Sequence, residues 1–78
     1  AHAAWGAVIE PAYTEFREAV IRAERFGEPA PWLDAYGAES LAEFFPVACE
    51  AYFVQHPRFA AEWPALAALF DAYFGLRA

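Results

Sequence analysis

Apolar residues recur along most of the chain at the three- and four-residue steps of an α-helix. Between residues 11 and 26 they form a single stripe, and charged side chains fill the opposite side. Pro11 suits the first turn of such a helix, and Gly27 suits the left-handed residue that ends one. The pattern predicts an amphipathic helix whose charged face meets solvent. The stripe consists of Tyr13, Phe16, Val20 and Ala23.

The stretches on either side of this helix look less regular. Residues 1–10 are small and apolar, with Trp5 and Ile9 as the expected anchors and Gly6 as a helix breaker. Residues 28–37, EPAPWLDAYG, contain two prolines and a glycine, so we expect a connector without regular structure. Its aromatic and aliphatic residues are too apolar for a free linker, and we expect it to be packed against the rest of the domain.

A second helix is predicted over residues 41–54, LAEFFPVACEAYFV. Ser40 and Glu43 have the Ser-x-x-Glu form of a capping box, which makes Ser40 the expected N-cap. Pro46 should distort the helix locally because it has no N–H to donate. Glu43 and Glu50 are seven residues apart and share one face of a helix that is otherwise nearly all apolar. Such a helix is expected to be buried, and buried carboxylates need partners.

The last third of the chain predicts a short helical turn and a third helix. His56-Pro57 should break the second helix, and residues 58–62 can form one helical turn. Pro64 suits the first turn of the final helix, and Gly75 suits the residue that ends it. No segment has the alternating pattern of a strand. We therefore expect residues 1–78 to form one all-α unit of three helices and a short helical turn.

Composition adds that the domain has more apolar side chains than it can hide. Of its 78 residues, 60% are hydrophobic, with 3 Trp, 4 Tyr and 8 Phe. A chain of this length has much surface and little interior. We expect part of its apolar surface to face a partner chain, a missing part of the same domain, or further copies of itself.

Charge and cysteine usage exclude several classes of function. The net charge of −6 argues against nucleic-acid binding, which requires clustered Lys and Arg. No window approaches 18 apolar residues and no secretory leader opens the chain, so neither a membrane span nor export is expected. The single cysteine, Cys49, excludes an internal disulfide and fits a reducing compartment, with the cytoplasm as the default.

Few side chains could carry chemistry. His2 and His56 are far apart and neither has the spacing of a metal-ligand pair. Cys49 lies in an apolar helix, where an inert thiol is expected rather than a nucleophile.

Tyr36, Glu39, Glu43 and Glu50 remain, and three of them have two readings each. Tyr36 is either an aromatic ring packed in the fold or a residue of a functional site, and composition favours the packing role. For Glu43, local sequence favours the capping-box role. Glu50 is either a core carboxylate with hydrogen-bond or Arg partners or a functional carboxylate, and the sequence favours neither reading. A glycosidase-like pair of Glu43 and Glu50 is conceivable, but the sequence offers no sugar platform.

The segment from Asp34 to Phe53, DAYGAESLAEFFPVACEAYF, resembles the C-terminal signature of the Mlc titration factor A family. These are bacterial, glucose-regulated, zinc-dependent peptidases of the gluzincin type. The shared pattern is a Tyr, six residues, Glu-Phe-Phe, and then a Glu seven positions after the first Glu. A Pro-containing segment and a final helix of Pro-x-Leu type follow in the expected order, so that the similarity extends from about Trp5 to Phe74.

The resemblance implies roles for the three residues. Glu43 would be the third zinc ligand, beside two histidines from an upstream His-Glu-x-x-His helix whose Glu is the general base. Tyr36 would stabilise the oxyanion formed from the peptide substrate, and Glu50 would support the site from behind the ligands. The resemblance also implies a second kind of function, docking to a transcriptional repressor of the Mlc type.

Three departures from the family pattern stand out. No His-Glu-x-x-His occurs in these 78 residues. Pro46 replaces the usual Ala, and the usual Asp-Pro after the last aromatic pair is missing. We therefore read the chain as the C-terminal helical portion of a zincin-like domain. It would be inactive alone, because one carboxylate cannot hold a catalytic zinc.

Overall fold

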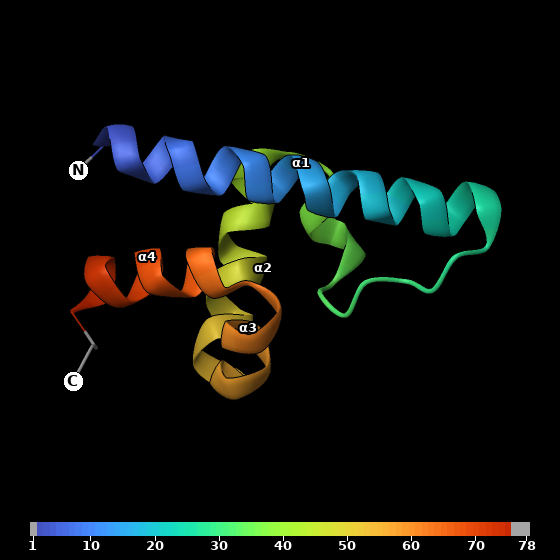
Figure 1. Ribbon diagram of the computed structural model, residues 1–78. Coiled ribbons are helices and arrows are strands. Elements are labelled where there is room, and N and C mark those ends of the chain that lie inside the picture. Colours follow the sequence, from blue (N-terminus) through green and yellow to red (C-terminus); the bar gives the residue numbers. More distant parts are fainter. Residues whose placement is uncertain (1, 76–78) are drawn as a thin grey trace.

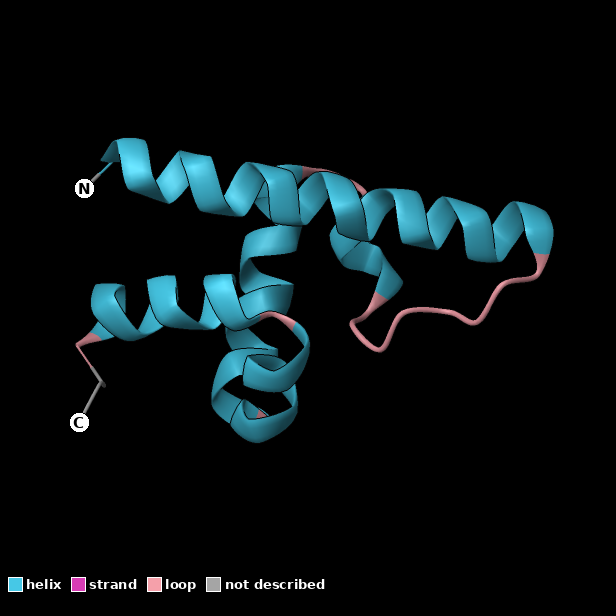
Figure 2. Cartoon of the chain, viewed as in Figure 1, coloured by secondary structure: helices cyan, strands magenta, loops and turns pink. Residues whose placement is uncertain are grey.

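The computed structural model describes residues 2–75, with side chains from Trp5 onward. Helices and loops make up this part of the chain, and no strand occurs in it (Figure 2). The predicted all-α class is confirmed. The elements are α1 (His2–Phe26), a 3-10 helix η1 (Ala35–Ala38), α2 (Leu41–Val54), α3 (His56–Glu62) and α4 (Pro64–Phe74).

The long helix α1 lies across one side of the molecule, and the other elements pack beneath it (Figure 1). Helix α2 runs away from the middle of α1. Helix α3 then reverses the chain, so that α4 returns to lie along the N-terminal half of α1 (Figure 1). None of the helices within residues 2–75 has the length and apolar character needed to cross a membrane.

The core is a cluster of aromatic rings to which every helix contributes. Phe16 of α1 lies 5.5 Å from Phe44 of α2, measured between ring centroids. Phe59 of α3 stacks on Phe70 of α4 at 5.9 Å, with an angle of 6° between the ring planes. Rings of this size each bury about 150–250 Å² and dominate the stability of a small core. This cluster therefore fixes the position of α2 relative to the other three helices.

The start of α1 corrects two predictions. Gly6 does not break the helix and Pro11 does not begin it, because α1 runs without interruption from His2. A proline inside a helix costs about 3 kcal/mol through a lost hydrogen bond and steric crowding. The packing of the first turns offsets this cost: Ile9 is buried, and the Trp5 ring lies 5.8 Å from Phe70.

Local signals placed most of the other boundaries correctly. Gly27 and Gly75 follow α1 and α4 with positive φ angles of 71° and 68°, as predicted. Pro64 opens α4 and α2 ends at Val54, also as predicted. The expected short turn is a seven-residue helix, α3, which starts two residues earlier than predicted because Pro57 fits its first turn.

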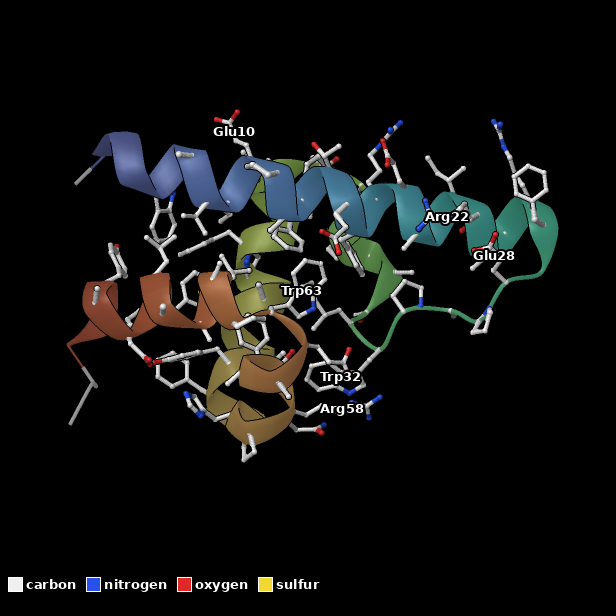
Figure 3. The ribbon with its side chains drawn as sticks, in the orientation of Figure 1. Glu10, Arg22, Glu28, Trp32, Arg58 and Trp63 are labelled. Atoms are coloured by element: carbon white, nitrogen blue, oxygen red, sulfur yellow. The ribbon has the colours of Figure 1, made fainter. Side chains whose placement is uncertain are left out.

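The connector is packed against the domain, although part of it is more regular than predicted. Its last residues form η1, so the expectation of no regular structure was wrong there. Leu33 is buried, and the Arg58 guanidinium carbon lies 4.7 Å from the centroid of the Trp32 ring (Figure 3). At its other end, Glu28 accepts a hydrogen bond from Arg22 Nε at 3.3 Å. These contacts hold the connector in place and set the position of η1.

Candidate functional site

Tyr36 is held on the surface by the turn that precedes it. Asp34 caps η1, since its Oδ1 accepts a hydrogen bond from the Tyr36 backbone N–H at 3.0 Å. Gly37 is buried against α2, where a Cβ would lie 3.3 Å from two side-chain carbons of Val47. A glycine allows this close approach, which brings η1 next to the first turns of α2. The Tyr36 ring itself is 55% exposed.

Glu43 lies in the first turn of α2. Ser40 is the N-cap, as predicted: its Oγ accepts a hydrogen bond from the Glu43 backbone N–H at 3.2 Å. The second half of a capping box is not formed, because the Glu43 carboxylate does not turn back to Ser40. Its Oε2 accepts a hydrogen bond from the Tyr36 hydroxyl at 2.8 Å instead. The structure thus joins Tyr36 and Glu43, two of the three residues singled out in the sequence.

The hydrogen bond changes the acidity of the tyrosine. The pKa of Tyr36 is raised above its usual value, first by the hydrogen bond to Glu43 and then by the negative charge of that carboxylate. Partial burial and the charge of Glu39 raise this pKa further. The Tyr36 hydroxyl therefore keeps its proton at neutral pH and acts as a hydrogen-bond donor, not as a base.

The pair presents one oriented carboxylate at the surface. Tyr36 fixes one oxygen of Glu43, and within residues 5–75 no second donor is bonded to the other oxygen. Glutamate oxygen is an accepted zinc ligand, and an orienting hydrogen bond of this kind is usual behind such ligands. However, no three His, Cys, Asp or Glu side chains gather closely enough to bind a metal in the described part of the chain. The site can contribute to a metal centre but does not form one alone.

Glu50 differs from the expectation of a buried face. It is exposed, and no charged residue is buried among those described. The buried face of α2 consists of Phe44, Ala48 and Tyr52, which point away from Glu50. Seven residues of helix place Glu50 about 10 Å along the axis from Glu43. The two carboxylates share a face, but that face meets solvent.

A second polar cluster, which no pattern in the sequence predicted, joins three helices. The buried Tyr52 hydroxyl of α2 donates a hydrogen bond to Asp71 of α4, and His56 Nε2 of α3 lies 3.7 Å from the same Asp71 oxygen. Burial, then the hydrogen bond and charge of Asp71, raise the pKa of Tyr52 to about 12. Nineteen residues separate Tyr52 from Asp71, so no local pattern could have paired them. The cluster holds α2, and with it Glu43, against α4.

The remaining candidates stay outside the site. Burial raises the pKa of the Cys49 thiol, which agrees with the inert cysteine that we predicted. The side chain of His2 lies outside the described residues.

Comparison with known protein families gives a match over most of the chain. A family model described as glucose-regulated metallo-peptidase M90 matches residues 1–75. No curated protein and no solved structure matches the chain.

Proposed function

The chain belongs to the glucose-regulated metallo-peptidase M90 family, and from this premise we propose that it forms one side of a peptide-hydrolysing zinc site. The observation that carries the proposal is the 2.8 Å hydrogen bond from the Tyr36 hydroxyl to Glu43 Oε2. It places a ligand-type carboxylate beside a neutral donor, both open to solvent on one surface. These are two of the groups that a zinc peptidase requires.

Glu43 is the proposed metal ligand. Its carboxylate is partly exposed, it is held at the start of a capped helix, and Tyr36 fixes the direction of one oxygen. The chemistry that zinc supplies in such sites is polarisation of the peptide carbonyl and a lower pKa for the attacking water. The remaining ligands and the general base require a His-Glu-x-x-His helix, which this sequence lacks.

Tyr36 is the proposed donor to the oxyanion. A donor aimed at developing negative charge contributes most when it is already in place and keeps its proton. Glu43 meets both conditions. Its carboxylate holds the Tyr36 hydroxyl at a defined position, and it raises the pKa of Tyr36 so that the hydroxyl keeps its proton. On substrate binding, the hydroxyl would transfer its hydrogen bond from Glu43 to the carbonyl oxygen of the scissile bond.

Glu50 has a lesser part in this proposal. At about 10 Å along the helix from Glu43 it cannot bind the same metal ion. We place Glu50 in the outer part of the site, where its negative charge acts electrostatically on the groups that surround the metal ligands.

The test is made in a protein that joins this chain to a His-Glu-x-x-His segment of the family. We expect the joined protein to bind one zinc ion and cleave peptides. Glu43→Ala should lower zinc affinity by more than the ~10–100-fold typical of losing an outer partner, and it should abolish cleavage. Tyr36→Phe removes the group that orients Glu43, so it should lower zinc affinity by no more than ~10–100-fold, and at saturating zinc it should lower kcat by about 100–1,000-fold.

The matched control is Glu24→Ala, which removes an exposed carboxylate of α1 that does not act on the acidity of Tyr36. It should leave zinc content and kcat close to those of the unchanged protein. Zinc binding and cleavage that persist in Glu43→Ala would refute the assignment of Glu43.

A second function is favoured by a different observation. Several large apolar side chains are exposed, among them Phe53 at 54%, Val54 at 70% and Tyr73 at 63%. Exposed apolar groups of this kind occur where proteins bind one another. The alternative is a docking module for a protein partner such as a repressor, or for another copy of the chain. Partner binding that persists after chelation of zinc would support docking independently of catalysis.

A further inference from the structure

A groove opens between the connector and α2, one helical turn beyond Glu43. Its volume is about 230 Å³. Leu33 is buried there, and three further apolar side chains of the lining are half-buried. These three are Trp32, Val47 and Ala51. The groove therefore offers an apolar surface on which the aliphatic part of a side chain can lie.

Two carboxylates line the same groove, and both are exposed. Asp34 uses one oxygen to cap η1, which fixes its position. Glu50 forms no ion pair with any residue in the described part of the chain. Arg58, whose guanidinium contacts Trp32 of the lining, is bonded through Nε to Glu62 Oε2 at 3.0 Å, so its charge is already balanced. The groove therefore carries an excess of about two negative charges.

We propose that this groove binds a cationic side chain, an arginine of the peptide that the enzyme cleaves. An arginine has an apolar stem and a charged planar end, and it can bury the first while the second meets a carboxylate. A purely apolar side chain would leave the Glu50 carboxylate, and the negative charge of Asp34, without a cationic partner. The structure already contains one such contact, since the Arg58 guanidinium lies over the Trp32 ring (Figure 3).

The distance of the groove from Glu43 determines which residue of the substrate the groove would bind. This step rests on the proposed function of Glu43. Val47 lies about 6 Å along the helix axis from Glu43, and Glu50 about 10 Å. An extended peptide advances about 3.3–3.6 Å per residue. The arginine would therefore lie two or three residues from the bond that is cleaved.

Binding is tested first on the chain itself, by NMR titration. The probes are the capped peptide acetyl-Ala-Ala-Arg-Ala-amide and its citrulline counterpart, which has nearly the same shape without the charge. We expect chemical-shift changes at the Trp32 indole and at the amides of residues 47–51. The arginine peptide should bind about two- to fivefold more tightly than the citrulline peptide, the range of a partly exposed ion pair. Added salt should reduce this ratio.

Glu50→Gln is the deciding variant, and it should bring the affinity ratio close to one. Glu24→Gln, which removes an exposed charge from α1, is the matched control and should leave the ratio unchanged. Equal affinity for the two peptides, or shifts centred away from the groove, would overturn the proposal.

Cleavage by the zinc-loaded joined protein then gives the second measurement, the ratio of kcat/KM for the two peptides. Glu50→Gln should lower the ratio of kcat/KM for the arginine peptide to that for the citrulline peptide if the groove binds arginine. An equal fall for both peptides would contradict the proposal, because it indicates only support of the metal. Absence of any cleavage would refute the zinc-site proposal alone, and the NMR ratio would still decide the groove.

Discussion

The hydrogen bond between Tyr52 and Asp71 gives a sharp prediction about what holds α2 in place. Tyr52 is only 1% exposed, whereas the Asp71 side chain is 28% exposed. Tyr52→Phe keeps the buried ring and removes only the hydroxyl, so it tests the bond without creating a cavity. The ring contact to Phe70, at 5.4 Å, should survive.

The size of the effect follows from the partners. A hydrogen bond to a charged group contributes about 1.5–3 kcal/mol, and water can partly replace the tyrosine because the Asp71 carboxylate is partly exposed. We therefore expect Tyr52→Phe to lower the free energy of unfolding by about 1–2 kcal/mol. At about 4–8 °C per kcal/mol for a domain of this length, the melting temperature should fall by roughly 5–15 °C.

The same bond predicts how stability depends on pH. The pKa of Tyr52 is raised from 10.0 in the free side chain to about 12 in the folded chain. The folded state therefore holds this proton more tightly than the unfolded state does. Its stabilising contribution is complete below pH 10 and is lost as the pH rises from 10 to 12. The difference in stability between the original chain and Tyr52→Phe should shrink over that range.

The assay is thermal or urea unfolding followed by circular dichroism at pH 8, 10 and 11.5. Tyr73→Phe is the matched control, because Tyr73 is 63% exposed and the change leaves its ring in place. That control should alter the melting temperature by no more than a few degrees. Equal melting temperatures for Tyr52→Phe and the original chain at pH 8 would refute the reasoning.

Two further predictions concern the Tyr36–Glu43 pair and the helix that carries it. Glu43→Ala should lower the pKa of Tyr36 towards its ordinary value, and Glu39→Ala should lower it less, as measured by NMR titration of ¹³C-labelled tyrosine; an unchanged Tyr36 titration in Glu43→Ala would contradict the observed bond. Ser40→Ala should lower the free energy of unfolding by about 0.5–2 kcal/mol through loss of the N-cap, while Ser40→Asp should not. Equal urea midpoints for Ser40→Ala and Ser40→Asp would count against the cap.

The Tyr36–Glu43 pair shows what a resemblance can predict. The family pattern assigned both residues to one site, but local sequence favoured a packed ring and a capping glutamate. The structure brings the hydroxyl and the carboxylate together at 2.8 Å, with the tyrosine exposed. The metal-ligand role of Glu43 and the oxyanion role of Tyr36 remain predictions, because both require groups that this chain does not contain.

The groove depends on contacts that no pattern in the sequence reveals. Nothing in the sequence brought Trp32, Asp34 and Glu50 together, because the connector that carries the first two has no periodic pattern. Their arrangement depends on the capped turn at Asp34 and on the burial of Leu33, which lines the groove together with residues of α2.

Sequence alone determined the helical class and most of the points where helices begin and end. Those points are set by single residues: a serine that caps, glycines that adopt positive φ, and prolines that fit a first turn. These effects act within one turn of the chain, so they can be read without knowledge of the fold. The uninterrupted course of α1 through Pro11 was missed because distant rings, not neighbouring residues, stabilise it.

Tertiary structure decided which face of α2 is inside. With apolar residues nearly all round that helix, several faces could have been buried, and the pattern favoured none. The rings of α1, α3 and α4 select the face of Phe44, Ala48 and Tyr52, and this choice turns the carboxylates outwards. Burying the aromatic face removes its rings from water, and this leaves Glu50 exposed and Glu43 half-buried at the surface.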